Sequence, residues 1–194
     1  MKKLFLGLGI FLTFLFLGIF LLFVSFKKEE TKPALSADAQ ITQKLKTLYS
    51  TYDKYGKYDN RIYGHPIPKN LFSTDLEKKL KEVVDITNAS VEKIKKSDHP
   101  TDKPHILEGS IFTSLYEGYT SYTIQSVVVN STGTSADATV RLEHAMSQPK
   151  FIWTDKVHLV KSDQEWKIDN ISFDSIGNSK DLKAILNDFI QNAK

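Results

Sequence analysis

The sequence predicts an α+β domain in which two amphipathic helices pack on a curved antiparallel sheet, with a further helix at the C-terminus and a transmembrane helix before the domain. Apolar residues recur every three or four positions in residues 41–55 and 76–94, which is typical of amphipathic helices. Apolar and polar residues alternate over most of residues 138–171, which is typical of half-buried strands. Residues 4–26 form an apolar run, and a bilayer-spanning helix needs about 20 such residues.

The clearest strand pattern lies between Phe151 and Phe173, where a polar turn at residues 162–165 divides two alternating segments. We expect a hairpin with a pocket-forming face. The register that continues the apolar face across it pairs Lys161 with Trp166, Leu159 with Ile168, and Val157 with Asn170. The apolar parity changes near Asp169, which predicts a bulge or the end of the strand.

Two earlier strands complete the predicted sheet. Residues 122–129 are apolar on both parities, which predicts a central strand covered on both faces. Residues 138–146 alternate, and a turn follows at residues 147–150. The predicted register pairs Met146 with Phe151, His144 with Trp153, Leu142 with Asp155, and Val140 with Val157.

Three helices are expected in the domain. The first carries the stripe Ile41, Leu45, Leu48, Tyr52 and Tyr55, and Gly56 ends it. Thr74 to Glu77 fits a capping box that opens the second. Ser179 can cap the third, which carries Leu182, Ile185, Leu186, Phe189 and Ile190 on one side. Residues 106–119 could form a strand, a short helix, or both, divided by Gly109.

Composition limits the function classes. The chain has 26 basic and 23 acidic residues, and two of the lysines, Lys2 and Lys3, precede the apolar run. The remainder has 24 basic residues against 23 acidic ones, so we expect no nucleic-acid partner. The absence of cysteine excludes disulfides and thiol catalysis. No phosphate loop, hydrolase elbow, zinc-protease motif or dinucleotide fingerprint occurs, so no cofactor is expected.

The N-terminal segment favours an uncleaved membrane anchor. A cleaved signal peptide, the alternative, has a shorter apolar region of about 7–15 residues followed closely by small residues. Lysines flank both ends of the run, but the short Met1-Lys2-Lys3 tail favours a cytoplasmic N-terminus. We therefore predict an anchor at residues 1–27, a linker at 28–35, and an extracytoplasmic domain at 36–194 on a single-pass protein of the inner (cytoplasmic) membrane.

Two amphipathic helices followed by a meander that ends in "WKIDNI", from Trp166 to Ile171, resemble the nuclear transport factor two-like (cystatin-like) cone superfamily. More narrowly, "YxxYGKY" at residues 52–58 and "LFSTDLEKKL" at residues 71–80 resemble a bacterial envelope family of unknown function. The resemblance covers residues 36–175 and implies a cone-shaped domain. The superfamily contains small-molecule enzymes, binding domains and toxin-immunity proteins, so the fold does not define the chemistry.

Polar residues on the apolar sheet face mark the first candidate site. His144 and Asp155 are neighbours in the predicted register and could act as a general-base pair in a pocket. A satisfied pair at the rim of the sheet is the alternative. Trp153, Tyr52 and Tyr55 are candidates for contacting a ligand or partner, although the favoured interpretation of the tyrosines is core packing with hydroxyls at the rim.

His99, Asp102 and His105 are weak metal-ligand candidates at spacings of three. They lie on a loop broken by prolines, where this spacing does not place three side chains on one face. The sequence thus favours a membrane-anchored binding module of the bacterial envelope, with a protein or small-ligand partner and possible immunity-type use. The alternative is an isomerase-like or dehydratase-like pocket enzyme that uses the Asp155–His144 pair.

Overall fold

The computed structural model describes residues 35–57, 61–176 and 181–193. The chain divides into two units, residues 1–34 and 35–194. The predicted membrane anchor and nearly all of the predicted linker lie outside the described residues. Within the described ranges, no helix has the length and apolar character needed to cross a membrane.

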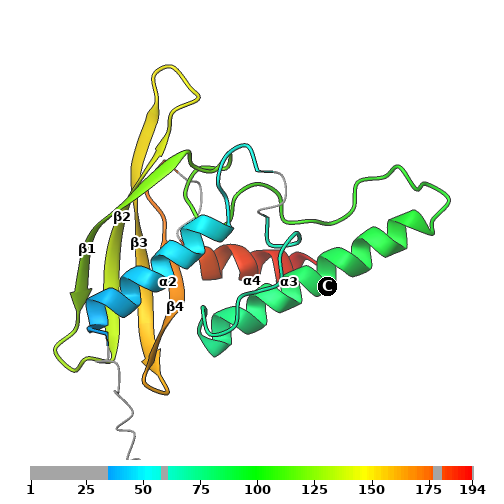
Figure 1. Ribbon diagram of the computed structural model, residues 1–194. Coiled ribbons are helices and arrows are strands. Elements are labelled where there is room, and N and C mark those ends of the chain that lie inside the picture. The colour runs from blue at the N-terminus through cyan, green and yellow to red at the C-terminus, as the bar shows by residue number, and fades with distance from the viewer. Residues whose placement is uncertain (1–34, 58–60, 177–180, 194) are drawn as a thin grey trace, which may run out of the picture. The chain divides into compact units, whose positions relative to one another are not determined.

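The described domain has the predicted α+β class. It contains helices α2 (Ala37–Thr51), α3 (Thr74–Lys95) and α4 (Leu182–Asn192), and strands β1 (Ser121–Val129), β2 (Ser135–His144), β3 (Phe151–Ser162) and β4 (Glu165–Ser172). The strands form one antiparallel sheet in the order β1-β2-β3-β4. Helix α2 crosses one face of the sheet and contacts β1 and β4, while α3 and α4 pack together and also contact β4 (Figure 1).

The β3–β4 hairpin confirms most of its predicted register. Lys161 pairs with Trp166 and Leu159 with Ile168. A bulge then follows, so that Val157 lies opposite Ile171 rather than the predicted Asn170. The extra residue on β4 turns Ile171 into the core, where it is fully buried. The predicted change of parity is therefore a bulge.

The β2–β3 register differs from the prediction by two residues. His144 lies opposite Phe151, Leu142 opposite Trp153, Val140 opposite Asp155, and Ala138 opposite Val157. The physical reason is a longer connection, because residues 145–150 lie outside both strands and Met146 is 64% exposed. A shift of two residues keeps every side chain on its predicted face, so the buried set is unchanged.

Strand β1 is an edge strand, and its prediction as a central covered strand is wrong. Its side chains alternate between half-buried and exposed positions over most of its length, and Val128 is 64% exposed. The β-branched residues stabilise an extended backbone without being enclosed. The opposite edge is partly covered, because Ile168 of β4 accepts a hydrogen bond from the Ser73 N–H and donates one to the Leu71 carbonyl.

The helix ends depart from the predictions in detail. Helix α2 ends at Thr51, so Tyr55 lies outside it. The Tyr119 hydroxyl binds the carbonyl oxygens of Tyr49 and Tyr52 at this end, and Asp53 then turns the chain with φ of 56°. The cap of α3 is the Ser73 hydroxyl rather than Thr74, one residue earlier than predicted.

Asp181 caps the C-terminal helix, α4, through the Ala184 N–H. The predicted cap, Ser179, lies outside the described residues. Helix α4 buries Leu182, Leu186, Phe189 and Ile190, four of the five residues predicted for its apolar side, whereas Ile185 is half-buried. The amphipathic pattern therefore located the helix and its buried side, although the cap is assigned to a different residue.

The core lies between the sheet and the helices. Leu45 of α2, Leu80 of α3 and Ile168 of β4 are fully buried, and Trp166 is 1% exposed. We expect Trp166→Ala to lower the free energy of unfolding by about 3–5 kcal/mol, because a large buried ring leaves a cavity. Urea denaturation checks this, with Ile152→Ala on an exposed side chain as the control. A loss below about 1 kcal/mol for Trp166→Ala would contradict its core position.

Candidate functional site

Residues 106–119 form neither a helix nor a strand of the sheet; they are an irregular segment held by two buried carboxylates. The Oδ2 atom of Asp53 accepts hydrogen bonds from the backbone N–H groups of Ile111 (2.9 Å) and Phe112 (2.6 Å). Asp155 accepts hydrogen bonds from the N–H (3.0 Å) and the hydroxyl of Ser114. The segment thus obtains from side chains the partners that a strand would find in a ladder.

The Asp155 carboxylate is the centre of a buried hydrogen-bond network. Besides Ser114, it accepts hydrogen bonds from the hydroxyl of Thr113 (3.2 Å), the indole N–H of Trp153 (3.2 Å) and the backbone N–H of Asp174 (3.2 Å). Trp153 is 3% exposed, and its indole N–H also lies 3.1 Å from the Thr113 hydroxyl. Both predicted site residues, Asp155 and Trp153, therefore serve to hold the segment onto β3.

His144 and Asp155 share a sheet face, as predicted, but the structure does not bring them together. His144 Nδ1 lies 3.1 Å from the Gly118 carbonyl oxygen, and its cross-strand partner is Phe151. Phe151 is four positions from Asp155 along β3, or about 13 Å at the rise of an extended strand. The two-residue difference in register produces this separation. A general base acting through the pair needs a contact that this geometry does not provide.

Burial dominates the ionisation of both carboxyl groups. It raises the pKa of Asp53 to about 7, and the hydrogen bonds from Phe112 and Ile111 offset only part of that effect. Burial also raises the pKa of Asp155, again against hydrogen bonds from Ser114 and others. A raised carboxyl pKa is a feature of functional sites, but here each group has a structural task.

The predicted ligand-contacting tyrosines separate into a core residue and a surface residue. Tyr52 is 1% exposed, and its ring packs 4.6 Å from Phe112. Tyr55 is 44% exposed, and its ring meets the His144 ring edge-to-face at 4.7 Å. Only Tyr55 can therefore contact a ligand directly.

Tyr55 lines an open cleft of about 530 Å³, which residues 53–57 and Arg61 form together with residues 109–110 and 116–117. The opposite wall carries Tyr116, which is 58% exposed, and Asp53 is a buried part of the lining. Lys57, Arg61 and Glu117 add charge to the cleft. Tyr116, Lys57 and Arg61 are not among the predicted site residues. Only the irregular path of residues 109–118 brings Tyr116 to the same cleft as Tyr55.

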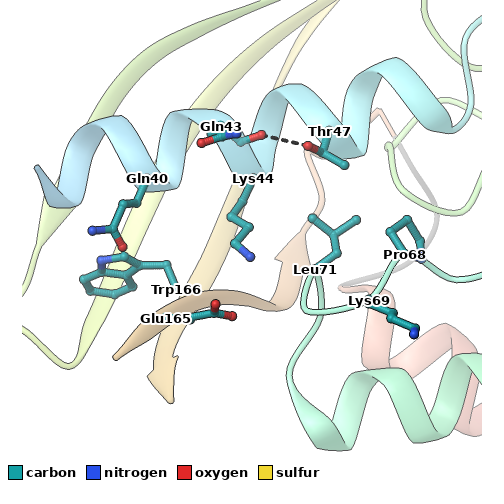
Figure 2. A pocket seen from close by; sticks show the side chains of 9 residues that line it. All are labelled: Gln40, Gln43, Lys44, Thr47, Pro68, Lys69, Leu71, Glu165 and Trp166. Carbon is teal, nitrogen blue, oxygen red and sulfur yellow. Dashed lines mark hydrogen bonds between the residues drawn. The ribbon is translucent and has the colours of Figure 1, made fainter. Parts of the chain in front are cut away.

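A second, smaller depression lies between α2, the segment before α3 and the start of β4 (Figure 2). Its volume is about 270 Å³. The Lys44 side chain extends from α2 toward this depression, and its Nζ donates a hydrogen bond to the Asn70 carbonyl. Because Lys44 bridges its two sides, this groove is less open to a ligand than the cleft at Tyr55.

Of the three weak metal candidates, His105 packs against α4 and the other two are exposed. The His105 ring stacks on Phe189 at 4.3 Å, and its backbone N–H donates to the Ser90 hydroxyl. His99 and Asp102 are exposed on the loop. The part of the chain that the structure describes contains no group of three His, Cys, Asp or Glu side chains that could hold a metal ion.

The outer sheet face carries a hydrogen-bonded array that no sequence pattern predicts. His158 Nδ1 lies 2.6 Å from an oxygen of Asp137, and Nε2 lies 2.7 Å from the Ser172 hydroxyl. This is the order of groups in a hydrolase triad. The Asp137 side chain is 51% exposed, however, so solvent screens its charge, and none of the clefts described above adjoins the array. The array therefore provides no argument for catalysis.

Comparison of the sequence with protein-family models identified no matching family, and neither the curated proteins nor the solved structures provided a match. The function must therefore be argued from the residues themselves.

The close approach of Gly118 to Asp53 gives a test of the packing at the cleft. Gly118 has φ of 80°, and a Cβ there would lie 2.1 Å from the Asp53 carbonyl oxygen. Gly133 has φ of 67° with open space around it. We expect Gly133→Ala to lower stability by about 1–2 kcal/mol from backbone strain alone. Gly118→Ala should cost about 1–3 kcal/mol more because of overpacking. Equal losses in urea denaturation would contradict the close contact.

Burial of the Asp53 carboxyl predicts that wild type and Asp53→Asn differ in free energy of unfolding by an amount that depends on pH. Its pKa rises from 3.8 to about 7 on folding, so the folded state retains a proton that the unfolded state loses. Below pH 4 the contribution of this proton to stability is complete. As the pH rises from 4 to about 7 the contribution is lost, and the free energy of unfolding falls by about 4 kcal/mol.

Asp53→Asn removes this pH-dependent loss of stability, because the amide does not ionise. The free energy of unfolding of the Asn variant should therefore increase relative to wild type between pH 4 and pH 7. Asn also tolerates the positive φ of this position. Chemical denaturation across this range measures the difference, and a difference that does not change with pH would show that the carboxyl ionises normally.

Proposed function

We propose that the protein is a membrane-anchored, extracytoplasmic binding module of the bacterial envelope, and that its ligand or partner binds at the Tyr55–Tyr116 cleft. In this proposal residues 4–26 span the inner membrane once, and the described domain lies outside the cytoplasm. The long apolar run and the short lysine-containing tail before it support that arrangement.

The observation that carries the proposal is the position of the cleft within the domain. The chain enters the described domain at Leu35, immediately before α2, and the cleft begins with Asp53, just beyond the other end of this helix. Fifteen helical residues span about 22 Å. The start of α2 and the tip of the β2–β3 hairpin lie at opposite ends of the sheet (Figure 1). The cleft therefore lies near the end of α2 that is opposite to the point where the chain enters the domain.

We also propose that the domain is a cone-like member of the nuclear transport factor two-like superfamily. The order of two helices followed by an antiparallel meander supports this proposal. Among pocket enzymes of this superfamily, catalysis would require polar groups that converge in an enclosed space. Here His144 and Asp155 are separated, and five donor groups occupy the Asp155 carboxylate. These contacts favour binding over the isomerase-like alternative.

A binding experiment on the full chain tests this function. The full-length protein, solubilised in detergent with its envelope fraction, should copurify with a component that native mass spectrometry and proteomics detect. Tyr116→Ala should reduce the recovered amount at least about tenfold, because truncating a central aromatic contact typically costs more than 1.4 kcal/mol.

The matched control is Val128→Ala, which truncates an exposed side chain on the edge of β1. Both variants should retain wild-type stability, since neither side chain belongs to the core. Repeated recovery of nothing, or equal recovery with Tyr116→Ala and wild type, would overturn the assignment of the cleft.

A further inference from the structure

Exposed apolar side chains concentrate around the cleft and the adjoining hairpin. Eight large hydrophobic residues among those described are at least 37% exposed, and four of them belong to this region. We call these four residues the distal surface: Tyr55, Tyr116, Met146 and Phe151. Ile152 follows Phe151 in β3 and therefore lies on the other face of the sheet. His144 connects the two parts of the distal surface, because its ring contacts Tyr55 and its cross-strand partner is Phe151. Concentrated exposed apolar surface marks an interaction site more often than isolated residues do.

The two tyrosine rings of the distal surface are held in place before any partner arrives. A Cβ atom on Gly109 would lie 2.4 Å from the Tyr116 ring, so the ring packs directly on the glycine backbone. The backbone N–H of Tyr55 donates to the Tyr119 carbonyl at 2.8 Å, and its ring rests against His144. Rings that are already ordered lose little conformational entropy on binding.

The composition of the distal surface favours a protein segment over a carbohydrate. Tyrosine and arginine walls could bind either class, since a sugar ring can stack on an aromatic face. Met146, however, offers aliphatic surface that a hydroxyl-rich sugar does not match. Aromatic residues, methionine and arginine are enriched together at protein interfaces.

The charges of the cleft indicate which side chains the partner carries. Lys57 and Arg61 contribute positive charge to the lining, against the exposed carboxylate of Glu117. Lys150, at the hairpin, forms an ion pair with Glu143 and adds no net charge. Carboxylates on the partner therefore complement the cleft better than basic groups do.

We propose that the distal surface binds an extended segment of a partner protein that presents a large apolar side chain to the two tyrosines and carboxylates to Lys57 and Arg61. This inference rests on the proposed function and specifies the class of partner. The tyrosine rings form the apolar contact, the basic side chains select acidic neighbours, and Met146 and Phe151 extend the contact along the hairpin.

A random peptide library displayed on phage tests the inference with the full chain held in lipid nanodiscs. We expect enrichment of peptides that contain an aromatic or large aliphatic residue next to Asp or Glu. A synthetic peptide from the enriched set should bind in fluorescence anisotropy. Tyr116→Ala and Met146→Ser should each weaken it at least about tenfold, whereas Val128→Ala should not. Met146 is 64% exposed in the hairpin connection, so its replacement leaves folding intact.

The charge requirement has its own comparison. Lys57→Glu should weaken the binding of the acidic peptide. It should leave unchanged the binding of a version of the peptide in which Asp and Glu are replaced by Asn and Gln. Failure to enrich such peptides, or binding unaffected by Tyr116→Ala and Met146→Ser, would overturn the inference. If the component that copurifies with the full chain survives protease and is destroyed by periodate, the ligand is a glycan. The assignment of a protein segment as the partner is then wrong, while the proposed binding function stands. If nothing copurifies either, both fail.

Discussion

The domain depends on two buried aspartates that bind the backbone of one irregular segment. Asp53 follows α2 and Asp155 lies in β3, far apart in sequence, yet both direct their carboxylates at residues 111–114. A segment without regular structure leaves its N–H groups unpaired, and a buried unpaired group costs about 1–3 kcal/mol. The two carboxylates satisfy these groups and connect the helix layer to the sheet. The segment can therefore be buried without being a strand.

In this arrangement the two carboxyl groups fix the path of the segment, although their burial disfavours their charged form. Burying a carboxyl group disfavours its charge, which is why the pKa of Asp53 rises to about 7 and that of Asp155 also rises. Replacing them with apolar residues would remove that penalty but would leave the segment's N–H groups without partners. The retained polar groups thus specify one path for the chain among the many that hydrophobic packing alone would permit.

The same path creates the cleft. After Asp53 holds Ile111 and Phe112, the chain turns back, and Tyr116 comes to lie on Gly109 and lines the same cleft as Tyr55. The walls of the cleft are therefore supported by the core on one side and open to solvent on the other. A binding surface built on such a support is ordered before it meets a partner, and its lining begins just beyond the end of α2 that is opposite to the start of the helix.

The sequence by itself determined the elements and their buried faces. Period-two alternation located β2, β3 and β4, the change of parity located the bulge near Asp169, and helical spacing located α2, α3 and α4, because these features depend on neighbours in the chain. Only the tertiary structure decided the rest. Contacts between distant residues set the edge position of β1, the β2–β3 register and the path of residues 106–119, and they bring Tyr55 and Tyr116 to one cleft. Side-chain periodicity does not encode such contacts: a shift of two residues leaves every face unchanged, and an irregular segment has no period.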